Sequence, residues 1–547
     1  MRRMQRRARL RGLGAGVLAL AMVAAACGGD DSSSGSSGNA SGNTIDAGVK
    51  AGVEAALSGG ATTAPGGAST TTAAVPQPTS IDAWEALWAK QRDAIVKRIT
   101  DNKWGKSADG RTLTGPEGFT VDLSKCAPGW SDTEGLTDTQ IKIGGATALS
   151  GTAADAGNWL RGADAWFKEQ SAKGAFKDST GKSRTIAFSY KDDGYDAART
   201  IPIVDELLDS EKVFALWTTG TPSGLKIYDK INARCVPQPT LISGSPAWGD
   251  PVNHPWTTGS LLSYGTEAVI WGAYIDQNFD TLAAGDGRVS VAGFVANSEF
   301  GATYDSAFRA VLAQSPHKDK IDFSTEKVEV SAPTVVDPMT TIAAKKPDVF
   351  ITMSGGAQCT QIITEAANNG LKDTAKALFT SSVCKASTNV SKAKVGGDGS
   401  ASNGWLIVGG GFKDFNAAAY DNDPFVVYGR KLLADNGLDY KSSGNLGQGL
   451  WYGWLWTQSL IVAGQLDGGL TRSNFILAQR VLDGVSPMHL PGIQMNMNGN
   501  ADAYFLEGSD LSAWDTASQQ WVLKGDVIEL SGKTKNCSWD VTAQACR

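Results

Sequence analysis

Histidine and closely spaced cysteine are scarce in this chain of 547 residues. Its three histidines, His254, His317 and His489, are scattered, and no two of them lie four residues apart, the spacing that places two zinc ligands on one helix face. No C-x-x-C pair occurs, so the pattern of a zinc ribbon or a dithiol redox site is missing. We therefore expect no metal site and no cofactor.

Motifs for nucleotide binding and nucleophilic catalysis are missing as well. No G-x-x-x-x-G-K-[ST] loop occurs and no G-x-G-x-x-G follows a predicted strand, which argues against a bound nucleotide. No G-x-S-x-G elbow is present, and spacing pairs no histidine with a particular serine. The carboxylates Asp192 and Asp193 stand between a predicted strand and a predicted helix, where helix capping is expected rather than glycoside hydrolysis. We expect no catalytic residues, and a secreted α/β hydrolase is the alternative.

Long apolar runs and an excess of basic residues are also lacking after residue 26. Residues 1–26 combine six arginines with a short apolar run from Leu13 to Ala26, which is the pattern of a signal peptide. The 44 basic residues of the remaining chain face 56 acidic ones, so the charge balance disfavours nucleic acid as a partner. We expect an exported chain that does not span the membrane.

Cys27 follows three alanines at the end of this apolar run. The position resembles the lipidated cysteine of bacterial lipoproteins, and a plain secretion signal is the alternative. Arg6 and Arg7 leave the general and the twin-arginine export routes open. Residues 27–80 are rich in Ser, Gly, Ala and Thr, and we expect a disordered tether because they bury too little apolar surface to fold. The prediction is a lipoprotein anchored at the extracellular or periplasmic side of the membrane.

The other six cysteines indicate disulfides, because their number is even and the chain is predicted to be exported. The sequence alone leaves many pairings open. We predict Cys359–Cys384 and Cys537–Cys546, which leaves Cys126–Cys235.

From Thr139 onward, short β-rich runs alternate with helical patterns. This rhythm predicts βαβ units with parallel strands whose carboxyl ends meet at one edge of the sheet. An interruption near residues 255–265 separates two such units and is a candidate hinge. The predicted fold class is α/β, with two Rossmann-like lobes. A later stripe at helical spacing predicts a buried helix face, and it consists of Trp451, Trp454, Leu455 and Val462.

Three predicted strands of the first unit end in small hydroxyl residues and glycine, at residues 148–151, 218–221 and 242–245. Hydroxyls and helix N-termini supply hydrogen-bond donors at such loops, and glycine lets a ligand approach the backbone. A single loop of this kind is most simply a well-capped turn. Three on one edge predict a donor-rich surface without formal charge, suited to a small polar ligand.

Longer segments carry a more specific pattern, among them TDTQIKIGGATALSGTAADAG, LWTTGTPSGLKIYDKINARCVPQPTLISGSPAWGD and DVFITMSGGAQCTQIITEAANNGLK. Over roughly residues 139–530 the chain resembles the solute-binding lipoproteins of branched-chain amino-acid ABC transporters, the leucine/isoleucine/valine-binding family with the type I periplasmic-binding-protein fold. The resemblance implies two lobes joined by three hinge strands, with C-terminal helices that return to the first lobe. It also implies a monomer that closes on a small molecule and docks on the subunits of an ABC permease.

The resemblance implies ligand-binding residues in the first lobe. Thr219, Gly220 and Thr221 match the loop that contacts the ligand's carboxylate, and Ser243 and Ser245 match the next loop.

In the loop after the first strand, Ser150 is the candidate, and Phe300 of the second lobe matches an aromatic residue that covers the ligand. Three positions depart from the family pattern. Ser382 stands where the family commonly has a carboxylate for the ligand's ammonium group, Gly355 and Gly356 replace an aromatic residue, and Ala247 replaces a threonine.

These departures affect the expected ligand. A buried ammonium group needs a counter-charge, so an aliphatic amino acid fits only if Glu299 or Asp155 supplies one. Otherwise an amide, an aromatic acid or another small metabolite is expected, and Gly356 with its neighbour leaves room for a larger ligand.

The predicted function is capture of a small polar solute by hinge closure and its delivery to an ABC importer. The alternatives are the secreted hydrolase and a sensory or scaffold lipoprotein with a degenerate pocket. The predicted segments are the signal peptide (1–26), the tether (27–80), an N-terminal helix and lead-in (81–138), the first lobe (139–262), the second lobe (263–395), a return mostly to the first lobe (396–500), and C-terminal strands with a disulfide-bearing tail (501–547).

Overall fold

The computed structural model describes residues 45–58, 77–543 and 545–547. The predicted signal peptide, Cys27 and most of the predicted tether lie outside these residues. None of the helices within the described ranges has the length and the apolar character needed to cross a bilayer.

The first sheet comes from the chain between residues 140 and 218, and its order is β5 (Phe176–Lys177), β6 (Ser183–Asp192), β4 (Gln140–Thr147) and β7 (Ala215–Thr218). β6, β4 and β7 are parallel. A parallel bridge between Thr219 and Ile242 adds the short pair β8 (Gln238–Leu241) and β9 (Thr257–Gly259). The connecting helices are α3 (Gly157–Ala172), α4 (Ala197–Asp205) and α5 (Thr221–Ala233).

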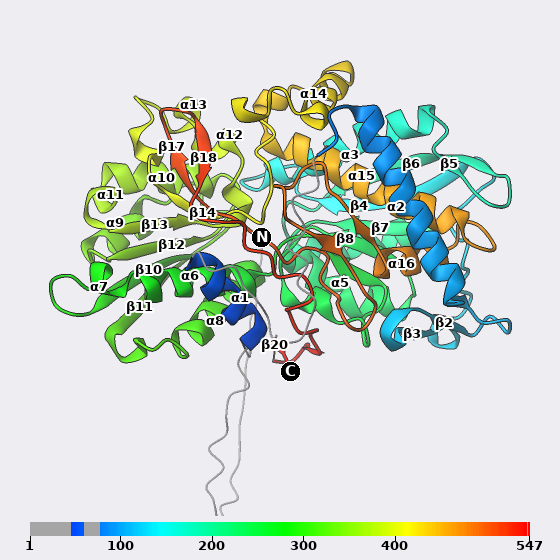
Figure 1. Ribbon diagram of the computed structural model, residues 1–547, viewed down its shortest axis with the longest axis horizontal. Coiled ribbons are helices and arrows are strands. Elements are labelled where there is room, and N and C mark those ends of the chain that lie inside the picture. Colours follow the sequence, from blue (N-terminus) through cyan, green and yellow to red (C-terminus); the bar gives the residue numbers. More distant parts are fainter. Residues whose placement is uncertain (1–44, 59–76, 544) are drawn as a thin grey trace, which may run out of the picture. The chain divides into compact units, whose positions relative to one another are not determined.

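The second sheet has seven strands, in the order β11 (Ile321–Val328), β10 (Val289–Ala296), β12 (Val349–Met353), β13 (Ala377–Thr380), β14 (Leu406–Val408), β17 (Leu511–Asp515) and β18 (Gln520–Leu523). The first five are parallel and the last two are antiparallel additions. Figure 1 shows β10, β12 and β13 side by side in green and yellow-green. The main helices of this lobe are α6 (Tyr264–Gln277), α8 (Glu299–Leu312), α9 (Val336–Ala344) and α10 (Gln358–Asn368).

Both sheets share one arrangement of their first parallel strands. β4 lies between β6 and β7 in the first sheet, and β10 lies between β11 and β12 in the second. Every residue of β7, β12 and β13 is buried, as expected for parallel strands with helices on both faces. The predicted α/β fold with two Rossmann-like lobes is confirmed.

Helices from the C-terminal third complete the first lobe: α14 (Pro424–Asp435), α15 (Gly444–Gln465) and α16 (Arg472–Arg480). α15 lies so close to α3 that a Cβ atom added to Gly162 would stand 2.2 Å from the Leu446 carbonyl oxygen. The predicted stripe on α15 is buried. The ring of Trp454 also contacts Trp88 of α2 (Ile81–Asp101), with centroids 5.3 Å apart.

Among the described residues, three crossing segments join the lobes between residues 260 and 510, at 260–263, 409–411 and 508–510, and the C-terminal tail passes between the lobes once more. The second and third are hydrogen-bonded to each other, because the Gly409 amide donates to the Asp510 carbonyl at 2.9 Å. Lys385 and Asp510 form a buried ion pair of 2.7 Å beside them. The first crossing lies within the predicted hinge near residues 255–265.

All three predicted disulfides are present. Cys126 is bonded to Cys235, Cys359 to Cys384, and Cys537 to Cys546.

The tether prediction is wrong for residues 45–58, because α1 (Ala47–Leu57) lies there. Val49 and Val53 are buried with residues of α6, and the Asp46 carboxylate caps the helix by accepting a hydrogen bond from the Gly48 amide at 2.8 Å. The two valines are four residues apart and therefore lie on one face of α1, which packs against α6. Composition averaged over the Ser- and Gly-rich neighbouring residues does not reveal the apolar surface that these two valines bury.

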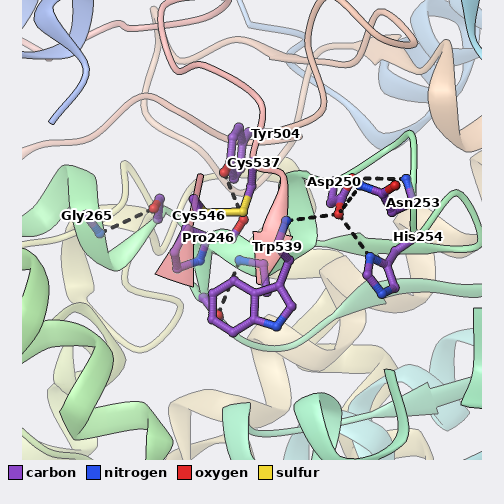
Figure 2. Close-up of a disulfide and its surroundings, with 12 residues drawn as sticks. Pro246, Asp250, Asn253, His254, Gly265, Tyr504, Cys537, Trp539 and Cys546 are labelled. Atoms are coloured by element: carbon purple, nitrogen blue, oxygen red, sulfur yellow. Dashed lines mark hydrogen bonds and ion pairs between the residues drawn. A yellow bond between two sulfur atoms is a disulfide. The ribbon is translucent and has the colours of Figure 1, made fainter. Parts of the chain in front are cut away.

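The C-terminal tail contacts both lobes. Leu530 is buried with the core of the second lobe, whereas Cys537 and Trp539 are buried with residues of the first. The Trp539 amide donates to the Asp250 carboxylate at 3.0 Å, and His254 Nδ1 lies 3.0 Å from the same oxygen (Figure 2).

Candidate ligand-binding site

The candidate site is a cleft at the carboxyl ends of both sheets. In each sheet, two neighbouring parallel strands, β4 and β7 or β10 and β12, continue into loops that lead away from each other. Ligands of open α/β folds bind between such loops. From the first lobe these loops, after β4 and β7, supply Thr152, Ala153, Asp155, Ala156, Thr219 and Gly220. From the second lobe the ends of β10 and β12 supply Ala296, Phe300, Ser354, Gly355 and Gly356.

Most of the wall is apolar. The cleft encloses about 780 Å³, counting space open to solvent. Four aromatic side chains line it: Trp159, Tyr195, Tyr264 and Phe300. Aliphatic side chains fill the gaps between them: Ile242, Leu261, Val330 and Val383.

Thr152 joins the lobes across this cleft through two hydrogen bonds. The Thr152 hydroxyl donates to the Val330 carbonyl at 2.6 Å, and the Ala357 amide donates to the Thr152 carbonyl at 3.2 Å. Gly356, between these contacts, has φ +62°, and a Cβ atom there would lie 3.0 Å from the Thr152 carbonyl oxygen. The loop after β4 thus touches the second lobe directly.

Four of the nine predicted ligand contacts line the cleft: Thr219, Gly220, Phe300 and Gly356. Gly220 precedes α5 with φ +91°, a conformation that glycine adopts without strain. The Thr219 hydroxyl is 2.7 Å from that of Thr147 and forms a hydrogen bond with it. Phe300, the first-turn aromatic of α8, packs edge-on against Tyr264 with ring centroids 5.2 Å apart.

Three predicted hydroxyl residues of the first lobe do not line the cleft: Thr221, Ser243 and Ser245. The Thr221 and Ser243 hydroxyls are hydrogen-bonded to each other at 2.7 Å, and Ser243 Oγ accepts from the Ser245 amide at 3.2 Å. All three side chains are buried. Ser245 Oγ in turn accepts from the Ala247 amide at 3.4 Å, so all three hydroxyls are hydrogen-bonded within the protein.

Ser150 is exposed and also lies outside the cleft wall. Its hydroxyl donates to Asp192 at 2.6 Å. Burial would raise the pKa of Asp192, but this bond and those from the Leu149 and Gly194 amides outweigh it and lower the pKa to about 2. Asp192 therefore holds the loop after β4 against the end of β6, and this agrees with a role in loop structure rather than glycoside hydrolysis.

Ser382, the last predicted contact, faces a carboxylate from another element. Its amide and hydroxyl donate to Glu267 of α6 at 3.1 and 2.6 Å, and the Tyr304 hydroxyl donates to the same carboxylate at 2.6 Å. Burial raises the pKa of Glu267 to about 7 against these bonds. Sequence reasoning missed Glu267, because nothing in the helical segment that contains it distinguishes it from a surface acid.

Asp155 is on the cleft wall, whereas Glu299 is exposed and is not. Asn158 and Asn445 each donate a side-chain amide hydrogen bond of 2.8 Å to the Asp155 carboxylate. Of the two acids considered as counter-charges, only Asp155 therefore lies on the cleft wall.

The three histidines lie away from the cleft. His254 is stacked on Tyr228, His317 on Phe279, and His489 is hydrogen-bonded to Ser486. The cleft thus has no serine–histidine pair among the described residues. In the same ranges, no group of three or more His, Cys, Asp or Glu side chains is arranged to hold a metal ion.

Comparison with known proteins agrees with the fold. The model of the periplasmic binding protein family matches residues 140–406. No curated protein matches the chain in sequence.

Solved structures share the fold at low sequence identity. A branched-chain amino-acid ABC transporter protein from Thermus thermophilus with bound valine has a TM-score of 0.60 at 15% identity, covering 72% of this chain and 97% of its own. A fatty acid ABC transporter substrate-binding protein from Thermomonospora curvata has a TM-score of 0.58 at 16% identity, with 74% and 96% covered. A solute-binding protein from Rhodopseudomonas palustris HaA2 in complex with p-hydroxybenzoic acid has a TM-score of 0.57 at 17% identity, with 72% and 98% covered.

Proposed function

Because the chain belongs to the periplasmic binding protein family through residues 140–406, we propose that it captures a small solute between its lobes and delivers it to an ABC importer. The observation that carries the proposal is the cleft, whose wall comes from both lobes at the carboxyl ends of their strands. Three crossing segments allow one lobe to rotate against the other, and a ligand that contacts both stabilises the closed arrangement.

Thr219, Gly220, Phe300 and Gly356 are the proposed ligand contacts among the residues expected from sequence. The wall adds Trp159, Tyr195 and Tyr264, whose rings offer aromatic surface to a solute. The structures with similar folds include complexes with valine and with p-hydroxybenzoic acid, and molecules of this size are the starting set for a search.

A thermal-shift screen tests solute binding. The chain from residue 28 onward is heated with amino acids, amides, aromatic acids and amines at fixed pH. A true ligand raises Tm in a saturable way, and at 100 times its Kd it adds about 2.7 kcal/mol to the free energy of unfolding. The proposal is rejected if no solute shifts Tm.

A variant pair checks where the solute binds. Phe300→Ala removes a ring from the cleft wall, whereas Phe323→Ala removes a partly buried ring of β11 that does not line it. The ligand-dependent shift should disappear only in the first variant. Equal shifts in both would place the ligand elsewhere.

We further propose that the protein is held at the membrane by a lipid on Cys27. The apolar run and the three alanines before this cysteine support the assignment. In cells, Cys27→Ser should move the protein from the membrane fraction to the soluble exported fraction. Unchanged membrane attachment would contradict the anchor.

A further inference from the structure

The wall of the cleft carries charge of one sign. Asp155 contributes the one charged side chain among the described residues that line it, and none of these is a lysine, arginine or histidine. Its oxygens each accept one amide hydrogen bond, from Asn158 and from Asn445, which orient the carboxylate. A carboxylate has about four acceptor positions, so capacity for a ligand remains.

The same wall offers little to an anionic ligand. Of the hydroxyls expected to hold a carboxylate, Thr221 and Ser243 are hydrogen-bonded to each other and lie off the wall. Thr219 lines the wall, but its hydroxyl is hydrogen-bonded to that of Thr147 at 2.7 Å. The N-terminus of α5 reaches the cleft through Gly220, whose amide donates a hydrogen bond of 3.0 Å to the Ile242 carbonyl. A ligand carboxylate would therefore sit near Asp155 with no cationic partner, and like charges at short range repel.

Aromatic rings make the wall favourable for a cation. The faces of Trp, Tyr and Phe attract a positive charge within about 6 Å of the ring centroid. Four aromatic side chains line the cleft: Trp159, Tyr195, Tyr264 and Phe300. The rings of Tyr264 and Phe300 are nearly perpendicular, with an interplanar angle of 85°. The aliphatic side chains between them suit an apolar body.

We propose that the solute is an organic cation with an apolar body and no carboxylate, such as an aliphatic or aromatic amine or a quaternary ammonium ion. This inference rests on the proposed function and names the ligand class of the same cleft. Asp155 supplies the counter-charge, and the four rings enclose the charged group and its substituents.

Calorimetry with probes of matched shape tests the proposal. The chain from residue 28 onward is titrated in amine-free phosphate buffer with choline, with its uncharged isostere 3,3-dimethylbutan-1-ol, with benzyltrimethylammonium, with benzoate and with leucine. We expect each cation to bind at least ten times more tightly than the neutral isostere, benzoate or leucine.

Variants assign the preference to named groups. Asp155→Asn keeps the shape of the side chain and should weaken cation binding at least ten-fold without changing the affinity for the alcohol. Glu299→Gln, which removes an exposed charge outside the cleft wall, should leave every affinity unchanged. Should Asp155→Asn fail to fold, Phe300→Leu serves instead, since it removes a ring face, retains an apolar side chain and should weaken cation binding selectively.

The outcomes separate this inference from the function beneath it. Tighter binding of benzoate or leucine than of the cations overturns the cation assignment and leaves solute capture standing. Equal binding of choline and its isostere also overturns it. If neither these probes nor any solute of the thermal-shift screen binds, both the assignment and solute capture fall.

Discussion

Glu267 is a fully buried carboxyl group at the start of the helix that follows the first crossing. Its pKa is raised from 4.5 to about 7, chiefly by burial, so the folded protein binds this proton more tightly than the unfolded chain. The stabilising contribution of the proton is complete below about pH 4.5 and is lost as the pH rises through about 7. Over this window the group lowers the free energy of unfolding by about 3 kcal/mol.

Replacing Glu267 by Gln removes this titration. Denaturant unfolding between pH 5 and 8 should show a smaller decline in stability for Glu267→Gln than for the native chain. Asp502 and Glu507, whose pKa values are raised by burial to about 6 and about 7, titrate in both proteins and cancel in the difference. A difference that is constant across this pH range would contradict the assignment.

Gly220 has a positive φ at the edge of the cleft, where a Cβ atom would lie 2.6 Å from the ring of Tyr195. Gly220→Ala should therefore lower the free energy of unfolding by about 1–3 kcal/mol and weaken ligand binding, because the ring of Tyr195 must move. Gly265→Ala is the matched control, since Gly265 is in a helix and an added Cβ atom would have only an ordinary contact there, 3.4 Å from the Ser263 hydroxyl oxygen. Chemical denaturation of both variants measures the difference, and equal losses would refute the steric argument.

At the scale of helices and strands, the alternation of apolar runs was enough to predict the sheets. β7, β12 and β13 are short, fully buried runs that have few other interpretations in an α/β context. α1 was not predictable by composition, because its docking depends on two valines and on α6, which lies more than two hundred residues away in sequence.

The docking of α1 can be tested at Gly52, where a Cβ atom would lie 2.6 Å from a methyl carbon of Leu530. Gly52→Val should displace the helix from α6 and the tail, whereas Ala51→Val changes an exposed position of the same helix. Hydrogen exchange of the α1 amides should accelerate at least ten-fold in the first variant only. Equal protection in both variants would show that α1 docks through other contacts.

The disulfides differ in the length of chain that they close. The Cys126–Cys235 bond spans 109 residues and the Cys537–Cys546 bond spans 9. If both act mainly on the entropy of the unfolded chain, replacing the first pair by serine should destabilise the protein by about 2 kcal/mol more than replacing the second. Guanidinium unfolding of the two double variants gives this difference, and a reversed order would show that packing of the tail outweighs loop closure.

At the scale of the whole molecule, the proposed ligand-binding surface is assembled from residues that no local pattern connects. Tyr195, Tyr264 and Phe300 reach one cleft from three different elements. The resemblance to a known family located the loops and the α8 aromatic, but not the direction of each hydroxyl. That direction depends on neighbours such as Tyr264, whose hydroxyl lies 3.5 Å from that of Thr221 across the two lobes.

Closure of the two lobes on a solute is the central claim. A substitution at Thr152 should make the closed state less stable. Thr152→Val removes the hydroxyl that donates to Val330 across the cleft while keeping the shape of the side chain. Loss of a net hydrogen bond of about 1 kcal/mol from the closed state should weaken solute binding about five-fold. Thr364→Val is the control, because its hydroxyl bonds to a carbonyl within α10.

The most direct measurement is single-molecule energy transfer between dyes on the exposed residues Ala198 and Thr334, which lie on the two lobes beyond β6 and β11. With the solute that raises Tm most, we predict that the population with the shorter dye separation grows with solute concentration and saturates at the calorimetric Kd. In Thr152→Val the same transition should require more solute. A dye separation that stays constant while the solute binds would contradict capture by closure of the lobes.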